Sequence, residues 1–376
     1  MIIELHLLQS FPVSNLNRDD VGQPKTATFG GVSRARISSQ SLKRAARLLF
    51  AEHGLEKRET ATRTKRLCDS AADVLRGQGK DAADARKVVI AGLESLGFGV
   101  DQVTGLTEYL LFVGGDAIEY LAGYCGERWD ALLAVAAAKN GTKKPAKIKP
   151  DAAARAQAAR LLDATRAADI ALFGRMIADN KDFNVDAASQ VAHALSTHAV
   201  ATEFDFYTAV DDLKPNGESG ADMLGTVDFN AACYYRYANL DLEQLHTNLG
   251  GDADLAARAV KAWLGAFVHA VPGGMQNTTA ARTMPGSFLG VVRERGAWNL
   301  ANAFLSPVVA DDLMAASTAC LLKHFGGLRR FYGSDGIHTA VAASATGDVP
   351  ETDGVDTADT LDAFTTRLLA PAMADA

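Results

Sequence analysis

The segments IIELHLLQS (residues 2–10) and SSQSLKRAARLLF (residues 38–50) decide the fold class of this chain of 376 residues. The first segment alternates, with Ile3, Leu5 and Leu7 on one face, and this period predicts a strand. In the second, apolar side chains recur every three or four residues, which predicts an amphipathic helix that begins at the first serines. The chain therefore opens with a strand that is followed by a helix.

The sequence around this pair predicts a loop and then a long helical stretch. Residues 11–36, which include NLNRDD, QPK and FGG, are rich in turn formers and predict a loop. Residues 56–175 are rich in alanine, favour helices and contain no convincing strand. Within them, KNGTKKPAKIKP (139–150) predicts a lysine-rich loop.

After residue 183, strand and helix patterns are mixed. Two β-rich segments, 190–210 and 229–240, flank a stretch rich in Gly, Asp and Pro, and together they predict a long hairpin. This order predicts an α+β fold with a ferredoxin-like core, into which a helical subdomain and the hairpin are inserted. The other elements that we expect are a short helix after Asp241, a helix at 253–271, a strand at 287–294, and helices at 311–325 and near 358–369.

Composition excludes several classes of protein. The chain is 48% hydrophobic and 22% charged, which is ordinary for a globular protein. No apolar run approaches the length of a membrane span, and the first residues lack the pattern of a signal peptide. The four cysteines lie far apart without a CxxC pair, so neither a disulfide scaffold nor a zinc ribbon is supported. We expect a cytoplasmic protein with no membrane partner.

The charge is distributed unevenly along the chain. Residues 1–66 carry twelve Lys and Arg against six Asp and Glu, although the whole chain has a net charge of −7. One basic groove on an acidic body is compatible with this distribution, because an electrostatic field depends on where the charges lie.

The common catalytic and cofactor motifs are absent from the sequence. There is no GxxxxGK[ST], no GxGxxG between a strand and a helix, and no GxSxG. His193 and His198 are five residues apart and do not share a face of a helix or a strand, so packing or surface roles are favoured over metal ligation. We therefore expect no cofactor and no metal.

The acidic pair Asp19–Asp20 has two possible roles. A carboxylate in a loop beside basic residues could position a metal ion or a water molecule for RNA cleavage. It could equally fix the loop, by pairing with Arg18 or by capping a turn, which is the commoner role of Asp.

The segment KTATFGGVSRARISSQSLKRAAR (25–47) is the strongest candidate for a binding site. A helix N-terminus leaves backbone N–H groups free and favours phosphate. Serines and a glutamine at this terminus could add hydrogen bonds to phosphate or ribose. The alternative interpretation is a solvated basic face with serine caps. The surrounding basic residues are Arg34, Arg36, Lys43, Arg44 and Arg47.

Two later segments carry candidate contacts. DIALFGRM places Arg175 and Met176 at the end of the helical stretch, and FDFYTAVDD places Phe204, Phe206 and Tyr207 in the hairpin. Exposed aromatic side chains could stack on single-stranded bases. Aromatic side chains at alternating strand positions are more often part of a core, so core packing is the favoured interpretation on pattern alone.

NLNRDD, Lys25, FGG and RISSQSLKRA, in this order, closely resemble the CasC family, the backbone subunits of the type I-E CRISPR surveillance complexes called Cascade. The resemblance continues through DIALFGRM, FYTAVDDL, YYRYANLDLEQLHTNLGG and NLANAF. It is weak over about residues 50–165 and after about residue 330.

The resemblance implies a shape like a right hand. The expected parts are an RNA-recognition-type palm at 1–55 and 181–376, helical fingers at 56–180, and a thumb hairpin at about 199–230. Several copies would stack along a CRISPR guide RNA, and each thumb would reach towards its neighbour.

Site residues are carried over from the family position by position. The resemblance implies that one group holds the guide backbone and that a second wedges against a flipped nucleotide. In the second group Tyr207 replaces the expected Phe and keeps the ability to stack. The family's basic residues after NLANAF have no clear match in LSPVVADD. The first group is Lys25, Ser38, Gln40, Lys43 and Arg47, the second is Met176, Tyr207 and Thr208, and the basic neighbours Arg18, Arg36 and Arg175 complete the expected RNA-binding set.

The resemblance implies a non-catalytic subunit that assembles on guide RNA for antiviral defence. The expected partners are the guide RNA, target DNA paired to it, further copies of the chain and other Cascade subunits. The alternative is a metal-dependent, guide-directed ribonuclease that uses Asp19 or Asp20, because backbone subunits of the related type III complexes cut RNA.

Overall fold

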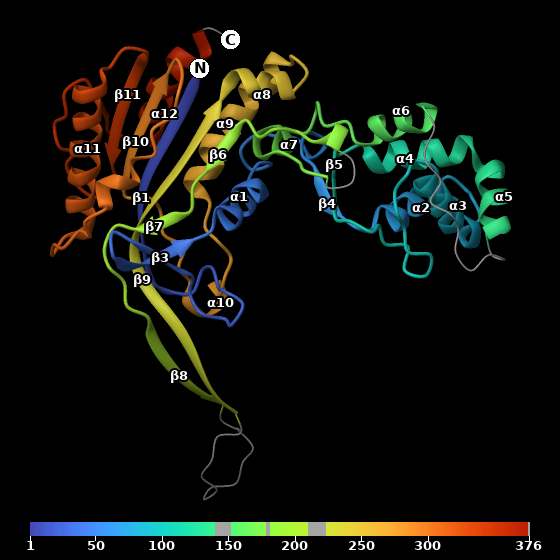
Figure 1. Ribbon diagram of the computed structural model, residues 1–376, viewed down its shortest axis with the longest axis horizontal. Helices are drawn as coiled ribbons and strands as arrows, with labels where there is room; N and C mark the ends of the chain where they lie inside the picture. Colours follow the sequence, from blue (N-terminus) through green and yellow to red (C-terminus); the bar gives the residue numbers. More distant parts are fainter. Residues whose placement is uncertain (140–151, 178–180, 210–222, 375–376) are drawn as a thin grey trace, which may run out of the picture. The chain divides into compact units, whose positions relative to one another are not determined.

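The chain divides into two compact units in its computed structural model, which describes residues 1–139, 152–177, 181–209 and 223–374 (Figure 1). The sheet unit comprises Met1–His53, Ser189–Glu243 and Val260–Ala376. The helical unit comprises Gly54–Ala188 and Gln244–Ala259. The sequence did not reveal that this second, short segment belongs with the helices.

The core of the sheet unit has the ferredoxin-like order. Four neighbouring strands follow the order β10-β1-β9-β7, and each runs antiparallel to the next. Along the chain, α1 lies between β1 and β7, and α9 lies between β9 and β10, so the predicted α+β class is confirmed. The bounds are β1 Ile2–Ser14, α1 Ser39–Leu48, β7 Ala194–Ser196, β9 Met223–Asp241, α9 Ala253–His269 and β10 Ser287–Arg293.

Further strands widen this core on both sides. β3 (Val32–Ile37) pairs with β7 and β2 (Thr26–Phe29) with β3, while β11 (Ile337–Ser344) pairs with β10 and β12 (Asp356–Ala358) runs parallel to β11. β6 (Ser189–Val191) pairs with β9. The sequence missed β11 and β12.

The loop predicted over residues 11–36 is in large part wrong. β1 continues to Ser14, and β2 and β3 form a hairpin whose turn is Gly30–Gly31, with φ of +63° and +80°. A Cβ atom on Gly30 would overlap the carbonyl group of Leu305. The turn therefore requires glycine for two reasons, the positive φ and the lack of space for a side chain. These strands were missed because β2 is largely polar and β3 has no regular apolar alternation, since the buried Arg34 interrupts it.

The predicted long hairpin is present. β8 (Glu203–Ala209) pairs antiparallel with the first part of β9, from Glu203 opposite Phe229 to Ala209 opposite Met223. β8 pairs with no other strand among the described residues. The loop between the two arms, residues 210–222, lies outside the described residues.

Helices cover both faces of the sheet. Leu289 on β10 packs in a cluster with Leu321 and Phe325 of α11, whereas the ring of Phe288 lies 5.6 Å from that of Phe364 on α12. Successive residues of a strand point to opposite faces, so α11 and α12 cover opposite faces. The predicted helix 311–325 is longer than expected. The remaining bounds in this region are α8 Leu242–Asn248, α10 Gln276–Thr279, η3 Leu300–Phe304, α11 Leu313–Tyr332 and α12 Leu361–Ala374.

The helical unit also contains a small two-stranded sheet, so the expectation of no strand over residues 56–175 was wrong. The strands are β4 (Thr62–Thr64) and β5 (Leu111–Val113). The lysine-rich segment predicted at 139–150 lies, except for its first residue, outside the described residues. The other elements are η1 Lys57–Glu59, α2 Leu67–Gly77, α3 Ala82–Ser95, α4 Ala117–Glu127, α5 Trp129–Lys139, α6 Ala152–Leu161, α7 Ala168–Phe173 and η2 Lys181–Phe183.

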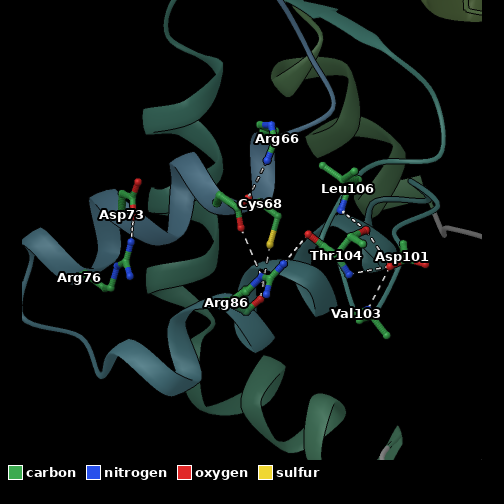
Figure 2. A network of polar contacts seen from close by, with 10 residues as sticks. Arg66, Cys68, Asp73, Arg76, Arg86, Asp101, Val103, Thr104 and Leu106 are labelled. Carbon is green, nitrogen blue, oxygen red and sulfur yellow. Dashed lines mark hydrogen bonds and ion pairs between the residues drawn. The ribbon is translucent and has the colours of Figure 1, made fainter.

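Polar contacts around Arg86 connect α2, α3 and the loop that follows α3 (Figure 2). The Arg86 Nε atom lies 3.3 Å from Asp69 Oδ1, and a guanidinium N–H donates to the carbonyl of Thr104. In that loop the Asp101 carboxylate accepts the backbone N–H of Thr104 at 2.7 Å. The Cys68 thiol donates to the carbonyl of Arg86 at 3.7 Å. One arginine thus joins three segments of the helical unit.

All four cysteines carry free thiols, as the sequence predicted. Cys68 and Cys125 are buried among the helices, and burial raises the pKa of Cys68 to about 11 and that of Cys125 to about 12. Both therefore stay protonated near neutral pH and are unreactive.

A buried polar network lies on the α11 face of the sheet. Arg293 Nε lies 2.7 Å from Glu4 Oε2, and Glu4 also accepts a hydrogen bond from Tyr237 Oη at 3.0 Å. His6 Nδ1 lies 2.8 Å from Tyr235 Oη, which accepts the backbone N–H of Leu300 at 2.9 Å. These contacts join β1, β9 and β10 to the segment that precedes α11.

Burial of His6 should make the fold sensitive to acid. Desolvation, with a smaller effect of Arg293, lowers the pKa of His6 to about 3 in the folded protein. The folded state then binds fewer protons than the unfolded state, so stability falls as the pH drops below about 6.5. At pH 5 the loss is about 2 kcal/mol.

The variant His6→Asn keeps a hydrogen-bond acceptor near Nδ1 and removes the titration. Its melting temperature should fall less between pH 7.5 and pH 5 than that of the wild type. The matched control is His338→Asn, on an exposed position of β11. Equal acid sensitivity of wild type and His6→Asn would show that His6 is not the titrating group.

Candidate nucleic-acid interface

The hairpin of β2 and β3 and the start of α1 bring together residues that were expected to contact the sugar-phosphate backbone of the guide RNA. The N–H of Lys25 donates to the carbonyl of Asn17 at 2.9 Å, and the N–H of Arg36 donates to the carbonyl of Lys25 at 2.8 Å. Ser38 follows directly as the N-cap of α1. Three expected site residues are therefore fixed by the backbone of one local structure.

The N-terminus of α1 differs from the open anion site that the sequence predicted. Asn17 Oδ1 accepts the N–H of Ser38 at 2.8 Å, and His193 Nδ1 accepts that of Ser39 at 3.3 Å. Ser38 Oγ accepts the N–H of Ser41 at 3.4 Å. Since side chains already satisfy these donors, a phosphate here would depend chiefly on side chains. Asn17 and His193 were missed as parts of this site, because their contacts join segments far apart in sequence.

The outer face of α1 carries polar and basic side chains, as its pattern predicted. Leu42 and Ala46 are buried, Gln40 and Arg44 are exposed, and Lys43 is half-buried. Arg47, one turn after Lys43, is also half-buried. The helix therefore packs through its apolar face and exposes Gln40 and Arg44, while Lys43 and Arg47 lie at the edge of that packing.

Arg36 is held in a defined orientation beside this helix. Its Nε–H donates to the carbonyl of Thr26 at 3.1 Å, and its Nη1 lies 3.3 Å from His193 Nδ1. A half-buried guanidinium with two fixed contacts is better ordered than a free surface arginine.

Two arginines have backbone partners: Arg34, one of the basic residues around the candidate site, and Arg175, which was expected to meet RNA. Arg34, buried, donates to the carbonyls of Ser196 at 3.1 Å and Phe304 at 2.8 Å. Arg175, also buried, donates to the carbonyls of Phe112 at 3.1 Å and Leu162 at 2.7 Å. Both side chains stabilise backbone segments, and their burial favours this structural role over contact with a phosphate. Sequence alone does not distinguish such arginines from surface ones.

The NLNRDD loop is organised by its first aspartate. Asp19 Oδ1 accepts the N–H groups of Val21 at 3.0 Å and Gln23 at 2.9 Å, which is the turn-capping geometry. Asp20 and the predicted RNA contact Arg18 are exposed. Across the residues that the structure describes, no three side chains of His, Cys, Asp or Glu gather as metal ligands. The geometry of Asp19 thus favours the structural interpretation.

His198 has a structural position too. Its Nδ1 lies 2.9 Å from the carbonyl of Ala199 and its Nε2 accepts the N–H of Cys233 at 3.2 Å. Both ring nitrogens are therefore occupied within the sheet unit.

The residues expected to wedge against a nucleotide are exposed. In the helical unit, Met176 is 84% exposed, and in the sheet unit Tyr207 is 42% exposed, with Thr208 beside it. Phe204 and Phe206 are exposed as well, so the preference for core packing of these aromatics was wrong. The reason is that β8 pairs only with β9 among the described strands, and its residues 203–208 are exposed.

Tyr207 is supported by the opposite strand of the ribbon. It pairs with Gly225 on β9, and a Cβ atom there would overlap the Tyr207 ring. The ring therefore lies across the glycine, which limits its freedom while leaving part of its surface accessible.

We predict that Met176→Ala with Tyr207→Ala changes the melting temperature of the free subunit only slightly. Exposed side chains contribute little to folding, so each change should alter the free energy of unfolding by less than about 0.5 kcal/mol. Leu42→Ala is the control, because truncation of a buried leucine should cost about 2–5 kcal/mol. A comparable loss in the double variant would contradict the exposure of its two residues.

The fold combines a ferredoxin-like sheet with an inserted helical unit, a basic helix and a long hairpin. Proteins of this class have solved structures. A structure described as "CRISPR RNA-guided surveillance complex, pre-nicking" contains a chain 33% identical to this one, with a TM-score of 0.85, covering 99% of this chain and 100% of that chain. Another, described as "CRISPR RNA-guided surveillance complex", is 28% identical, with a TM-score of 0.74 and coverage of 99% and 100%. No curated protein matches the chain.

The family model described as "CT1975-like protein" matches residues 3–367, and the chain belongs to this family. The resemblance to the CasC family drawn from the sequence is thereby confirmed. Within the described ranges, no helix has the length and apolar composition that a bilayer span requires.

Proposed function

We propose that this chain is a non-catalytic, guide-RNA-binding backbone subunit of a type I-E CRISPR surveillance complex. The observation that carries the proposal is the ordered group of Lys25, Arg36 and the outer face of α1, on an otherwise acidic chain. The solved structures that it resembles are RNA-guided surveillance complexes. In this proposal the subunit is cytoplasmic and serves antiviral defence.

The basic group suits the sugar-phosphate backbone of RNA. Lys25, Arg36, Lys43 and Arg47 would contact phosphates, and the Gln40 amide can donate to phosphate or ribose oxygens. Such contacts carry no sequence information, so base edges remain available to pair with target DNA. This division suits a subunit that must accept any guide sequence.

The hairpin supports a second part of the proposal. Tyr207 on its glycine platform offers a ring face, and stacking of a base on an aromatic side chain tolerates any sequence. The exposed Phe204 and Phe206 give the ribbon an apolar surface, which suits contact with another macromolecule. We propose that copies of this chain assemble along the guide, together with the other Cascade subunits.

A test of RNA binding replaces Lys25 and Lys43 with glutamine. For each phosphate that is no longer neutralised by a lysine, the salt dependence of single-strand binding should become shallower by about 0.7 in log–log slope. The control is Lys261→Gln with Lys323→Gln, two exposed lysines on α9 and α11 whose replacement changes the net charge equally. RNA affinity should be measured from about 50 to 200 mM salt, and equal slopes for both double variants would contradict the assigned surface.

The absence of catalysis is tested separately. Assembled complex, incubated with complementary RNA and Mg²⁺, should leave the RNA intact, because the Asp19 carboxylate is engaged in its turn. Regularly spaced cuts that disappear in Asp20→Ala would overturn the non-catalytic assignment and favour the ribonuclease.

A further inference from the structure

His193 lies where three segments of the sheet unit meet. It stands between β6 and β7, and its Nδ1 atom lies 3.3 Å from the backbone nitrogen of Ser39 and 3.3 Å from Nη1 of Arg36. Because β7 pairs with β3, its position beside the start of α1 is set by the sheet. Its contacts therefore reach both elements that carry the basic group.

The contacts determine the protonation state of the imidazole. The Ser39 N–H and the guanidinium of Arg36 are both donors, so Nδ1 must be an acceptor and the proton must lie on Nε2. Desolvation, with the nearby charges of Arg36 and Lys25, lowers the pKa of His193. The first turn of α1 contains no acidic residue that would oppose this effect. The neutral imidazole of His193, with its proton on Nε2, is thus the form that fits these two contacts.

His193 also completes the orientation of Arg36. A guanidinium has five N–H donors, and one is taken by the carbonyl of Thr26 and one by His193. Neither acceptor is charged, and in the described part of the chain Arg36 has no carboxylate partner. Its remaining donors are held in a fixed direction and its charge is not neutralised.

We propose that His193 is a positioning residue of the guide interface, whose neutral imidazole holds Arg36 ready for a guide phosphate and caps the first turn of α1. The inference rests on the proposed function, since it assigns Arg36 to RNA. Because the guanidinium is already ordered before binding, less conformational entropy is lost when the phosphate arrives.

The test uses the full-length chain and a single-stranded RNA of guide length. His193→Ala removes the acceptor, whereas His193→Asn places an amide oxygen close to the position of Nδ1. His193→Ala should weaken RNA binding about tenfold, as expected when a charge-assisted hydrogen bond is removed. It should also make the slope of log affinity against log salt concentration shallower. His193→Asn should restore most of the affinity and the slope, which mere filling of space would not do.

A double-mutant cycle separates positioning from general structural damage. If His193 acts mainly through Arg36, then His193→Ala combined with Arg36→Gln should bind hardly more weakly than Arg36→Gln alone. Additive losses, or no rescue by His193→Asn, would overturn the inference. His198→Ala is the control for a structural histidine and should lower the melting temperature without altering the salt slope.

Failure of the proposed function would look different. The assigned RNA interface itself would be contradicted if the wild-type protein bound RNA without salt dependence. An unchanged salt slope in the Lys25 and Lys43 double variant would contradict it as well. An intact interface with an unaffected His193→Ala variant would refute only the role of His193.

Discussion

Strand β9 is the constraint on which the rest of the sheet unit depends. It has 19 residues, and one continuous backbone pairs with β8 in the hairpin and with β1, β6 and β7 in the sheet. The sheet therefore sets the direction in which the hairpin leaves it. Arg236, near its middle, is fully buried and donates to the side chain of Gln9 and the carbonyl of Phe267, which ties β9 to β1 and α9. Burial lowers the pKa of Arg236 to about 9, so it remains charged near neutral pH.

The buried arginines explain why the cations of this chain cannot be counted as one group. Arg34, Arg175 and Arg236 donate to backbone carbonyls, and Arg293 pairs with Glu4. Buried carbonyl groups at the ends and edges of helices and strands need donors, and a guanidinium can serve several at once. These side chains hold the scaffold, whereas the cations at the surface are the ones that can meet a polyanion.

The sequence predicted the parts of the fold that have a clear hydrophobic period. The alternation in β1 and the spacing in α1 were sufficient, and the ferredoxin-like order followed from them and from the later strands and helices. The hairpin of β2 and β3 was missed because β2 is largely polar and the buried Arg34 interrupts the apolar pattern of β3. β11 and β12 depend on pairing with distant partners rather than on a strong local pattern.

The same limit applies to the site. Lys43 and Gln40 could be placed outside the apolar stripe of α1 from spacing alone, but the burial of Arg34 depends on Ser196 and Phe304, more than 150 residues away in sequence. His193 had no local signal at all, since both of its partners lie in another part of the chain. Exposure of the hairpin aromatics could not be predicted either, because alternation does not reveal whether a neighbouring layer exists to cover them.

The capped start of α1 has a consequence for how this interface would recognise RNA. With the N–H groups of Ser38, Ser39 and Ser41 occupied by Asn17, His193 and Ser38, the helix N-terminus offers a phosphate little direct hydrogen bonding. Affinity must then come from side-chain charges held in place, and such affinity depends on salt and is indifferent to base sequence. The acidic remainder of the chain would disfavour nucleic acid elsewhere, so the basic group of the proposal would direct the strand. Under the proposed function, an interface of this kind would fix the path of a guide without reading its bases, and the bases would then remain free to pair.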